Sequence, residues 1–204
     1  MSKEKIVGKD IFKNFFHLAA NRKEGVDYSI VTREVPGSNV AIVAPHGGIE
    51  TGTIAMAKAI AANDFNLYLF NSLRSQELYD AGGNWHELHI TSIHFDEPRC
   101  LELVGKTDVT LTVHGSRIKE PVVCLSSMDK KLESKLSAAF NKAGVKVLIE
   151  GHPYQSGKLP ENICNRNRKK QGVQLEFSQG IRDNPALRET CVRVVRESLK
   201  GLTA

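Results

Sequence analysis

Side chains that can bind a metal occur in two short motifs, and each motif directly follows an apolar run. His46 and Glu50 lie in the segment PHGGIE (45–50), and His114 lies in TVHG (112–115). Zinc accepts imidazole nitrogen and carboxylate oxygen, and two histidines with one glutamate leave a coordination position open for water. In number and type, His46, Glu50 and His114 therefore match a catalytic zinc site.

Each motif taken alone also fits a role without metal. Gly47-Gly48 suits a tight turn, with Glu50 at the start of a helix where its charge complements the helix dipole. The same glycines suit an anion-binding loop at a helix N-terminus. His114 alone fits a hydrogen-bonded histidine at the end of a strand. These alternatives stay open as long as the motifs are considered one at a time.

A further carboxylate, Glu176, lies among apolar neighbours in the strand-like segment GVQLEFS (172–178). A charge in such surroundings is costly unless it is paired, exposed in a cleft or protonated. A general base beside a zinc-bound water would explain the position of Glu176. The alternative, which the alternation of the strand favours, is a glutamate that faces solvent.

The polar segment NICNRNR (162–168) precedes the strand that carries Glu176. Arginine forms bidentate hydrogen bonds with carboxylates. We therefore expect Asn165 and Arg166 to hold a carboxylate of the substrate. The adjoining residues 168–170 (RKK) are expected to form a solvated basic loop.

Three more histidines, His86, His89 and His94, occur close together in the sequence. On a strand over residues 86–91, His86 and His89 would point to opposite faces, so their spacing does not support a metal site. We expect these side chains to line the substrate site, to support the metal ligands or to pack in the core.

Strand-like apolar runs alternate along the chain with helical patterns. Strands are expected at residues 27–35, 39–44, 66–70, 86–91, 108–113, 121–125, 145–150 and 172–178, and helices at residues 52–62, 97–103, 128–143 and 184–200. His46, His114 and Glu176 lie at or near carboxyl ends of strands, where the ligand sites of open α/β sheets collect. We predict an α/β fold with one catalytic domain (1–204), in which helices flank both faces of a central, mixed, twisted β-sheet.

Composition narrows the partners without choosing one. The 204 residues are 41% hydrophobic and 25% charged, with a net charge of +5. A basic protein attracts acidic partners, which could be nucleic acid, anionic lipid or a polyanionic substrate. Nucleic acid is disfavoured because aromatic residues make up only 6% of the chain and stacking platforms are therefore scarce. The four cysteines form no C-x-x-C pair, and we expect buried thiols.

The N-terminal segment MSKEK is polar, which argues against a cleaved signal peptide. No apolar run approaches the roughly 20 residues of a membrane span. We expect a protein made in the cytoplasm that acts outside only after lysis or by an unconventional route. The oligomeric state is open, and a monomer is compatible with the sequence.

Four segments together resemble the phage-type poly-γ-glutamate hydrolase family, which is related in fold to zinc carboxypeptidases. They are APHGGIETGT (44–53), LHITSIHFDEP (88–98), TVHGSR (112–117) and NICNRNRKKQGVQLEFSQGIR (162–182). The resemblance implies a carboxypeptidase-like fold and hydrolysis of γ-glutamyl amide bonds in a capsule or biofilm polymer. The ordered set of segments, which spans most of the chain, makes this resemblance specific.

The resemblance also implies roles for single residues. It implies a zinc ion held by His46, Glu50 and His114, with Glu176 as catalytic base. On that chemistry, Arg166 or Arg117 would steady the developing oxyanion or a substrate carboxylate. In one respect the chain departs from zinc carboxypeptidases, which separate the first histidine and the glutamate by two residues, whereas here three residues intervene.

Two other functions are compatible with the sequence. The same zinc site could serve a peptidoglycan or peptide amidase, which turnover on purified polymers would reveal. A basic, non-enzymatic module that binds polyanions would hold no metal, and its affinity would fall steeply with salt.

Overall fold

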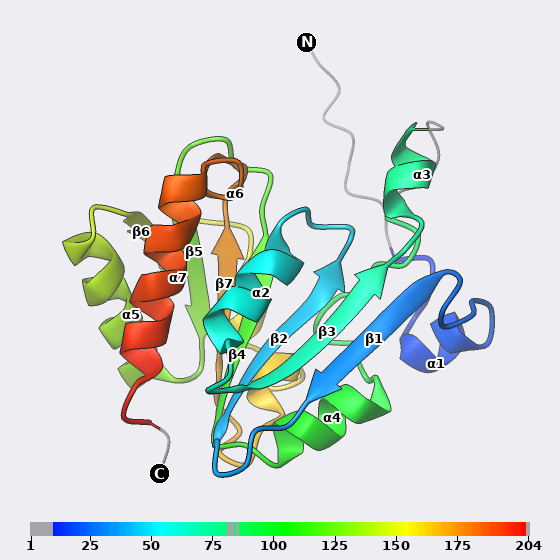
Figure 1. The fold of residues 1–204 in the computed structure, drawn as a ribbon, viewed down its shortest axis with the longest axis horizontal. Helices are drawn as coiled ribbons and strands as arrows, with labels where there is room; N and C mark the ends of the chain where they lie inside the picture. The colour runs from blue at the N-terminus through cyan, green and yellow to red at the C-terminus, as the bar shows by residue number, and fades with distance from the viewer. Residues whose placement is uncertain (1–9, 81–83, 85, 203–204) are drawn as a thin grey trace.

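The computed structural model describes residues 10–80, 84 and 86–202. A seven-stranded mixed sheet forms the centre of the molecule, with the strand order β1-β3-β2-β4-β7-β5-β6 (Figure 1). The strands are β1 Tyr28–Arg33, β2 Val40–Gly47, β3 Asn66–Ser72, β4 Val109–Gly115, β5 Val122–Ser127, β6 Lys146–Leu148 and β7 Val173–Phe177. Strands β3, β2, β4 and β7 run parallel, whereas β1 and β5 are antiparallel to their neighbours β3 and β7.

Helices cover both faces of the sheet (Figure 1). The helices are α1 Phe15–Ala19, α2 Thr53–Ala61, α3 Ser75–Asp80, α4 Pro98–Gly105, α5 Lys130–Lys142, α6 Gln179–Arg182 and α7 Pro185–Leu199, with short 3-10 turns at Ser156–Lys158 and Ile163–Asn165. One core contains buried residues of α2, α5 and α7, and a second core contains buried residues of α1 and α4. The predicted fold class, a mixed sheet between two helical layers, is confirmed.

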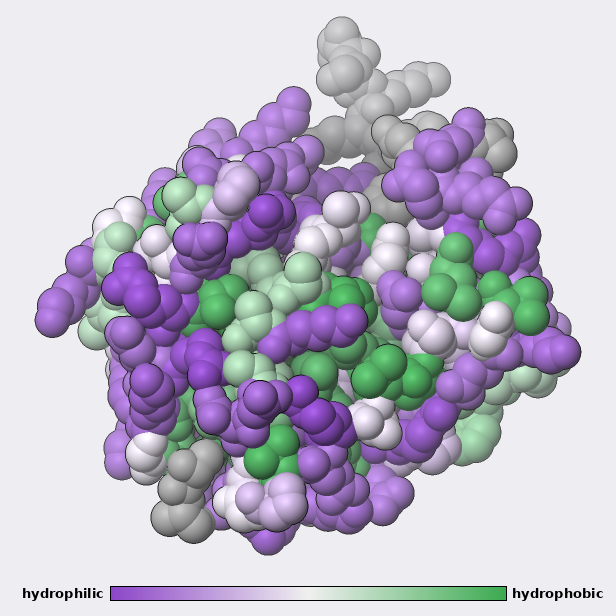
Figure 2. Space-filling view, viewed as in Figure 1, coloured by the Kyte–Doolittle hydropathy of each residue, from purple (hydrophilic) through white to green (hydrophobic). Residues whose placement is uncertain are grey.

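The period of two in β2 explains how one strand serves both cores. Ile42 and Ala44 pack in the core below α2, and Ala41 and Val43 pack in the core below α4. Because successive side chains of a strand point to opposite faces, a strand buried on both sides must be apolar throughout. Figure 2 shows apolar residues gathered near the centre of the visible face, where α2 lies, with polar residues around them.

Most predicted elements occur within a few residues of their expected positions, but the strand predicted at 86–91 is wrong. Residues 86–88 form a turn, in which the backbone N–H of His89 donates to the carbonyl of His86 at 2.9 Å. The backbone N–H of Thr91 donates to the carboxylate of Asp10 at 2.6 Å. The side chain of Asp10 therefore accepts the hydrogen bond that a neighbouring strand would accept in a sheet. Helices α1, α3 and α6 were not predicted, because each is too short to show a helical period.

All four cysteines are free and buried, as expected from their apolar surroundings. Within the described part of the chain, no helix combines the length and the apolar character needed to cross a membrane.

Candidate active site

Three neighbouring parallel strands bring the candidate residues to one edge of the sheet. His46 lies near the end of β2, His114 near the end of β4 and Glu176 near the end of β7. The arrowheads of β2 and β7 mark this edge at the top of Figure 1. His114 and Glu176 are direct neighbours across the β4–β7 pair. Residues far apart in sequence are thus assembled where the strand order predicts a ligand site.

The loop after β2 returns Glu50 to His46 despite the three intervening residues. The backbone N–H of Glu50 donates to the carbonyl of His46 at 2.9 Å, which closes a turn. Gly48 has a φ of +77°, and a Cβ atom there would lie 2.1 Å from the carbonyl oxygen of Ser72. Glycine is therefore required by both backbone angle and space. The space that a side chain would occupy at Gly48 is taken by the backbone of Ser72, so it is not open to a substrate.

Three donor atoms converge within this turn and the end of β4. One ligand atom from each of His46, Glu50 and His114 can be chosen so that all three lie within 4.8 Å of one another. The Nδ1 atom of His46 is 3.1 Å from Glu50 Oε1 and 3.1 Å from His114 Nδ1. His114 Nδ1 is 3.7 Å from Glu50 Oε2. Ligands of a tetrahedral zinc with bonds of about 2.0–2.1 Å lie about 3.3 Å apart, so these separations fit such an ion.

The hydrogen bonds of His46 show that its Nδ1 atom offers a lone pair. His46 Nε2 lies 2.8 Å from the carbonyl oxygen of Ile90, which can only accept. The proton of the neutral ring is therefore on Nε2, and Nδ1 faces an oxygen of Glu50 without a hydrogen between them. Such an arrangement of acceptors requires a cation, either an added proton or a metal ion. The residues present thus fit zinc in donor type, tautomer and spacing.

The charge on Glu50 governs the protonation of this cluster. Burial would raise the pKa of Glu50, but the positive charge that His46 can carry outweighs it and lowers the pKa. Burial lowers the pKa of His46, and the charge and hydrogen bond of Glu50 outweigh this to raise it. Burial lowers the pKa of His114 to about 3. His114 is therefore a neutral imidazole at physiological pH, as a metal ligand must be.

Glu176 faces the same cavity and is only 5% exposed. Its Oε1 accepts a hydrogen bond from Gln174 Nε2 at 2.9 Å. Burial, with the nearby charge of Glu50, raises the pKa of Glu176 well above its usual value. The structure thus excludes the alternative of a solvent-facing glutamate.

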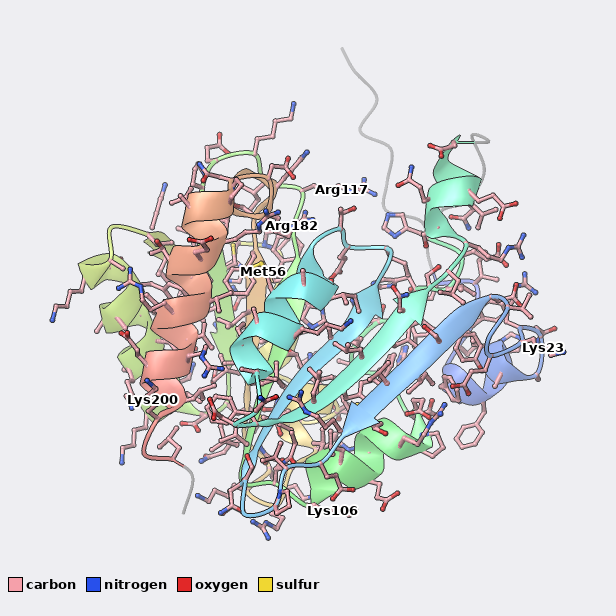
Figure 3. All side chains as sticks on the ribbon, viewed as in Figure 1. Lys23, Met56, Lys106, Arg117, Arg182 and Lys200 are labelled. Carbon is pink, nitrogen blue, oxygen red and sulfur yellow. The ribbon has the colours of Figure 1, made fainter. Side chains whose placement is uncertain are left out.

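Arg182 lines the cavity and was missed by the sequence analysis. Its three guanidinium nitrogens donate to backbone carbonyls of Phe177, Thr51 and Ser116, which lie at or beyond the ends of β7, β2 and β4. Figure 3 shows Arg182, the last residue of α6, at the edge of the sheet where these strands end. Its position in SQGIR gave no periodic signal. A buried arginine that ties three strand ends together can be recognised only from the fold.

The wall of the cavity includes Arg117 and two of the clustered histidines. Arg117 is exposed and extends toward the upper rim in Figure 3, and its Nη2 lies 2.7 Å from His86 Nε2. The ring of His89 packs on the ring of His46 with a centroid distance of 4.1 Å, and its Nδ1 lies 2.7 Å from Asp10 Oδ1. Arg117, His86 and His89 all line the cavity, which has a volume of about 710 Å³.

The structure does not bring Asn165 and Arg166 to the cavity, contrary to expectation. Arg166 is exposed and does not line it. Asn165 is buried, donates to the carbonyls of Gly157 and Leu159, and accepts from the backbone N–H of Gly172. Its polar atoms are used within the loop, so the asparagine stabilises local structure. The cavity cations come instead from Arg117 and Arg182.

Comparison with known proteins identifies the family of the chain. Residues 12–193 match the family model described as poly-gamma-glutamate hydrolase. The protein YndL of Bacillus subtilis (strain 168) is 34% identical over 180 residues, 87% of this chain and 67% of YndL. The prophage-derived protein YoqZ of the same organism is 33% identical over 85% of this chain and 60% of YoqZ. The chain thus spans about two thirds or less of these two relatives.

Two solved structures share the fold over nearly the whole chain. A bacteriophage poly-gamma-glutamate hydrolase superposes with a TM-score of 0.81 at 24% identity, covering 93% of this chain and 96% of that one. A zinc-free structure of YndL superposes with a TM-score of 0.82 at 28% identity, covering 96% of this chain and all of that one. Family and fold together point to a hydrolase. The chain belongs to the poly-gamma-glutamate hydrolase family.

Proposed function

We propose that the protein is a zinc-dependent hydrolase of γ-glutamyl amide bonds in poly-γ-glutamate. The observation that carries the proposal is the convergence of lone pairs from His46, Glu50 and His114 in a cavity that also holds the buried carboxylate of Glu176. When bound there, zinc would supply a Lewis acid that polarises the scissile carbonyl and acidifies water. His46, Glu50 and His114 would hold it.

Glu176 would perform the proton transfers of the reaction. A general base takes a proton from the attacking water and then gives it to the leaving amine, which requires a pKa near the working pH. Burial moves the pKa of Glu176 upward, in the direction that this dual role needs. The side chain is held by Gln174 and not by solvent.

The cations of the cavity suit a substrate rich in carboxylates. Arg182 lies deep in the cavity, where the positive charge of its guanidinium group can stabilise a developing oxyanion. Arg117 lies at the exposed rim and can meet a free carboxylate of the polymer. With the net charge of +5, the two arginines favour a polyanionic chain over a neutral peptide.

The test is depolymerisation of purified poly-γ-glutamate by the zinc-loaded protein, followed by viscosity and by release of amino groups. Glu176→Gln keeps the shape of the side chain and removes the base, so we expect kcat to fall by about 10²–10⁴-fold with zinc still bound. Glu133→Gln is the matched control, because Glu133 is also 5% exposed but lies on α5. It should keep its activity.

The outcomes separate the possible functions. Cleavage by the wild type that is lost in Glu176→Gln supports the proposal. If the protein binds zinc and cleaves peptidoglycan peptides but not poly-γ-glutamate, the assignment as a metallohydrolase stands and the proposed substrate is wrong. A wild type that binds no zinc when supplied with it would overturn the proposal in favour of a polyanion-binding module.

A further inference from the structure

Two buried amides connect the NICN motif to the proposed base. Asn162 Nδ2 lies 2.7 Å from Gln174 Oε1, and Gln174 Nε2 lies 2.9 Å from Glu176 Oε1. Asn162 is fully buried and Gln174 is 3% exposed. We propose that Asn162 and Gln174 are positioning residues that form a hydrogen-bond relay and orient the carboxylate of Glu176. The inference rests on the proposed function for the role of Glu176.

A backbone group determines the direction of this relay. The N–H of Cys164, which can only donate, lies 3.0 Å from Asn162 Oδ1. Asn162 must therefore direct its NH₂ group to Gln174, which in turn presents its oxygen to Asn162 and its NH₂ group to Glu176. Turning either amide over would place an acceptor against an acceptor or a donor against a donor. The backbone N–H of Cys164 thus fixes the orientation of Asn162, and Asn162 in turn fixes that of Gln174.

A hydroxyl group reinforces the same direction. Ser156 Oγ lies 3.1 Å from Gln174 Oε1 and 3.2 Å from Asn162 Nδ2. By donating to the Gln174 oxygen and accepting from Asn162, the hydroxyl saturates the buried polar atoms around the two amides. Satisfied buried networks are rigid, and a partly satisfied one is costly. The relay is therefore suited to holding one orientation.

The relay distinguishes the two oxygens of Glu176. Because Oε1 accepts from Gln174, it is held as an acceptor, and the proton that Glu176 takes up is carried by Oε2. Glu176 lines the cavity. On this assignment, Oε1 is held by Gln174 and Oε2 is available for proton transfer. Catalytic proton transfer depends on such placement, since misplacement of a reacting group by about 1 Å can cost about 100-fold in rate.

The segment that carries the relay is pressed onto the sheet. A Cβ atom on Gly157 would lie 2.2 Å from the carbonyl oxygen of Ser126 in β5 and 2.9 Å from the Cβ of Gln174 in β7. Only glycine permits this approach. The turn at 156–158 therefore lies directly over Gln174 and keeps Ser156 within hydrogen-bond distance of it.

Asn162→Asp is the most direct test, because the side chain of residue 162 is connected to Glu176 through Gln174. An aspartate there can only accept, so it would attract the NH₂ group of Gln174 and turn the Gln174 oxygen toward Glu176. We expect kcat to fall about tenfold or more, with KM and zinc content little changed. Gln174→Leu removes the final donor and should cause a similar loss.

Two comparisons separate orientation from simple loss of stability. Asn167→Asp makes the same chemical change in the same motif, at a residue 0% exposed whose side-chain hydrogen bonds reach only backbone groups of Asp108 and Gln171. It should lower Tm and leave the kcat of the folded protein unchanged. The double variant Asn162→Asp/Gln174→Leu should lose no more kcat than Gln174→Leu alone, because Asn162 acts through Gln174.

A readout independent of turnover is the side-chain amide resonance of Gln174 in ¹H–¹⁵N NMR spectra. Glu176→Gln and Asn162→Asp should both shift it, and Asn167→Asp should leave it in place. If the first two variants leave the resonance unmoved, or if Asn162→Asp keeps full kcat, the relay is overturned. If the resonance responds as expected but the wild type cleaves no γ-glutamyl amide, the proposed function fails and the relay stands.

Discussion

The Nδ1 atoms of His46 and His114 face each other at 3.1 Å, across the boundary between β2 and β4. Neither ring can reach this position without the sheet, because 67 residues separate the two side chains in sequence. With Glu50 between the two strand ends, the pair defines the place where a cation would be held.

Removal of the His114 ring should abolish zinc binding between the two strand ends. We expect about one zinc per chain in the wild type and far less in His114→Ala, measured by elemental analysis after dialysis. Added zinc should raise the Tm of the wild type, since a ligand that binds only the native state stabilises it, and should not raise that of His114→Ala. His152→Ala, at a buried histidine that does not line the cavity, is the control. Equal zinc in all three proteins would exclude His114 as a ligand.

Arg182 should be irreplaceable by lysine. A single ammonium group cannot bridge the three carbonyls that the guanidinium nitrogens reach. Buried acceptors left without donors cost about 1–3 kcal/mol each, so we expect Arg182→Lys to lose about 2–4 kcal/mol in urea unfolding and to have reduced kcat. Arg193→Lys, an exposed change on α7, should be neutral. A fully stable and active Arg182→Lys would show that the three strand ends need no such tie.

Asp10 should make stability depend on pH. Burial would raise its pKa, but hydrogen bonds from His89 and Thr91 outweigh this and lower it to about 2. A depressed carboxyl pKa stabilises the fold above the unfolded value of about 4, and this stability is lost as pH falls toward about 2. The unfolding free energies of wild type and Asp10→Asn should differ by about 1–2 kcal/mol at pH 6, and by less at pH 3. A difference independent of pH would contradict this account.

The turn between His46 and Glu50 should reject even a methyl group. In Gly48→Ala the Cβ atom would lie 2.1 Å from Ser72 O at a positive φ, so strain and overpacking add to a loss of about 3 kcal/mol or more. Gly25→Ala has a similar φ of +82° with nothing within 4 Å and should cost about 1 kcal/mol. Urea unfolding of both variants measures the difference, and similar losses would mean that the contact with Ser72 relaxes freely.

Much of the site was predictable from sequence because its residues follow buried strands. Apolar runs identified β2, β4 and β7, and the rule that parallel strands expose their carboxyl ends at one edge placed His46, His114 and Glu176 together. The type and number of donors then predicted zinc. These inferences use local patterns and a general property of α/β sheets, so they did not need coordinates.

Other features depend on contacts between segments distant in sequence. The segment 86–91 alternates like a strand, yet Asp10 binds His89 and Thr91 in an irregular segment, and both His86 and His89 line the cavity. Arg166, attractive for its charge, faces solvent, and the buried cation is Arg182.

Apolar patterns in the sequence indicate the seven strands of the sheet, their buried faces and the residue types at their ends. Tertiary contacts decide which polar side chains connect to the site, because Asn162 reaches Gln174 whereas the side chain of Asn165 bonds only to backbone groups. The physical reason is that a hydrogen bond depends on direction and on a specific partner, whereas hydrophobic burial depends mainly on area. Sequence periodicity therefore predicts which side chains are buried, whereas their hydrogen-bond partners are known only from the folded structure.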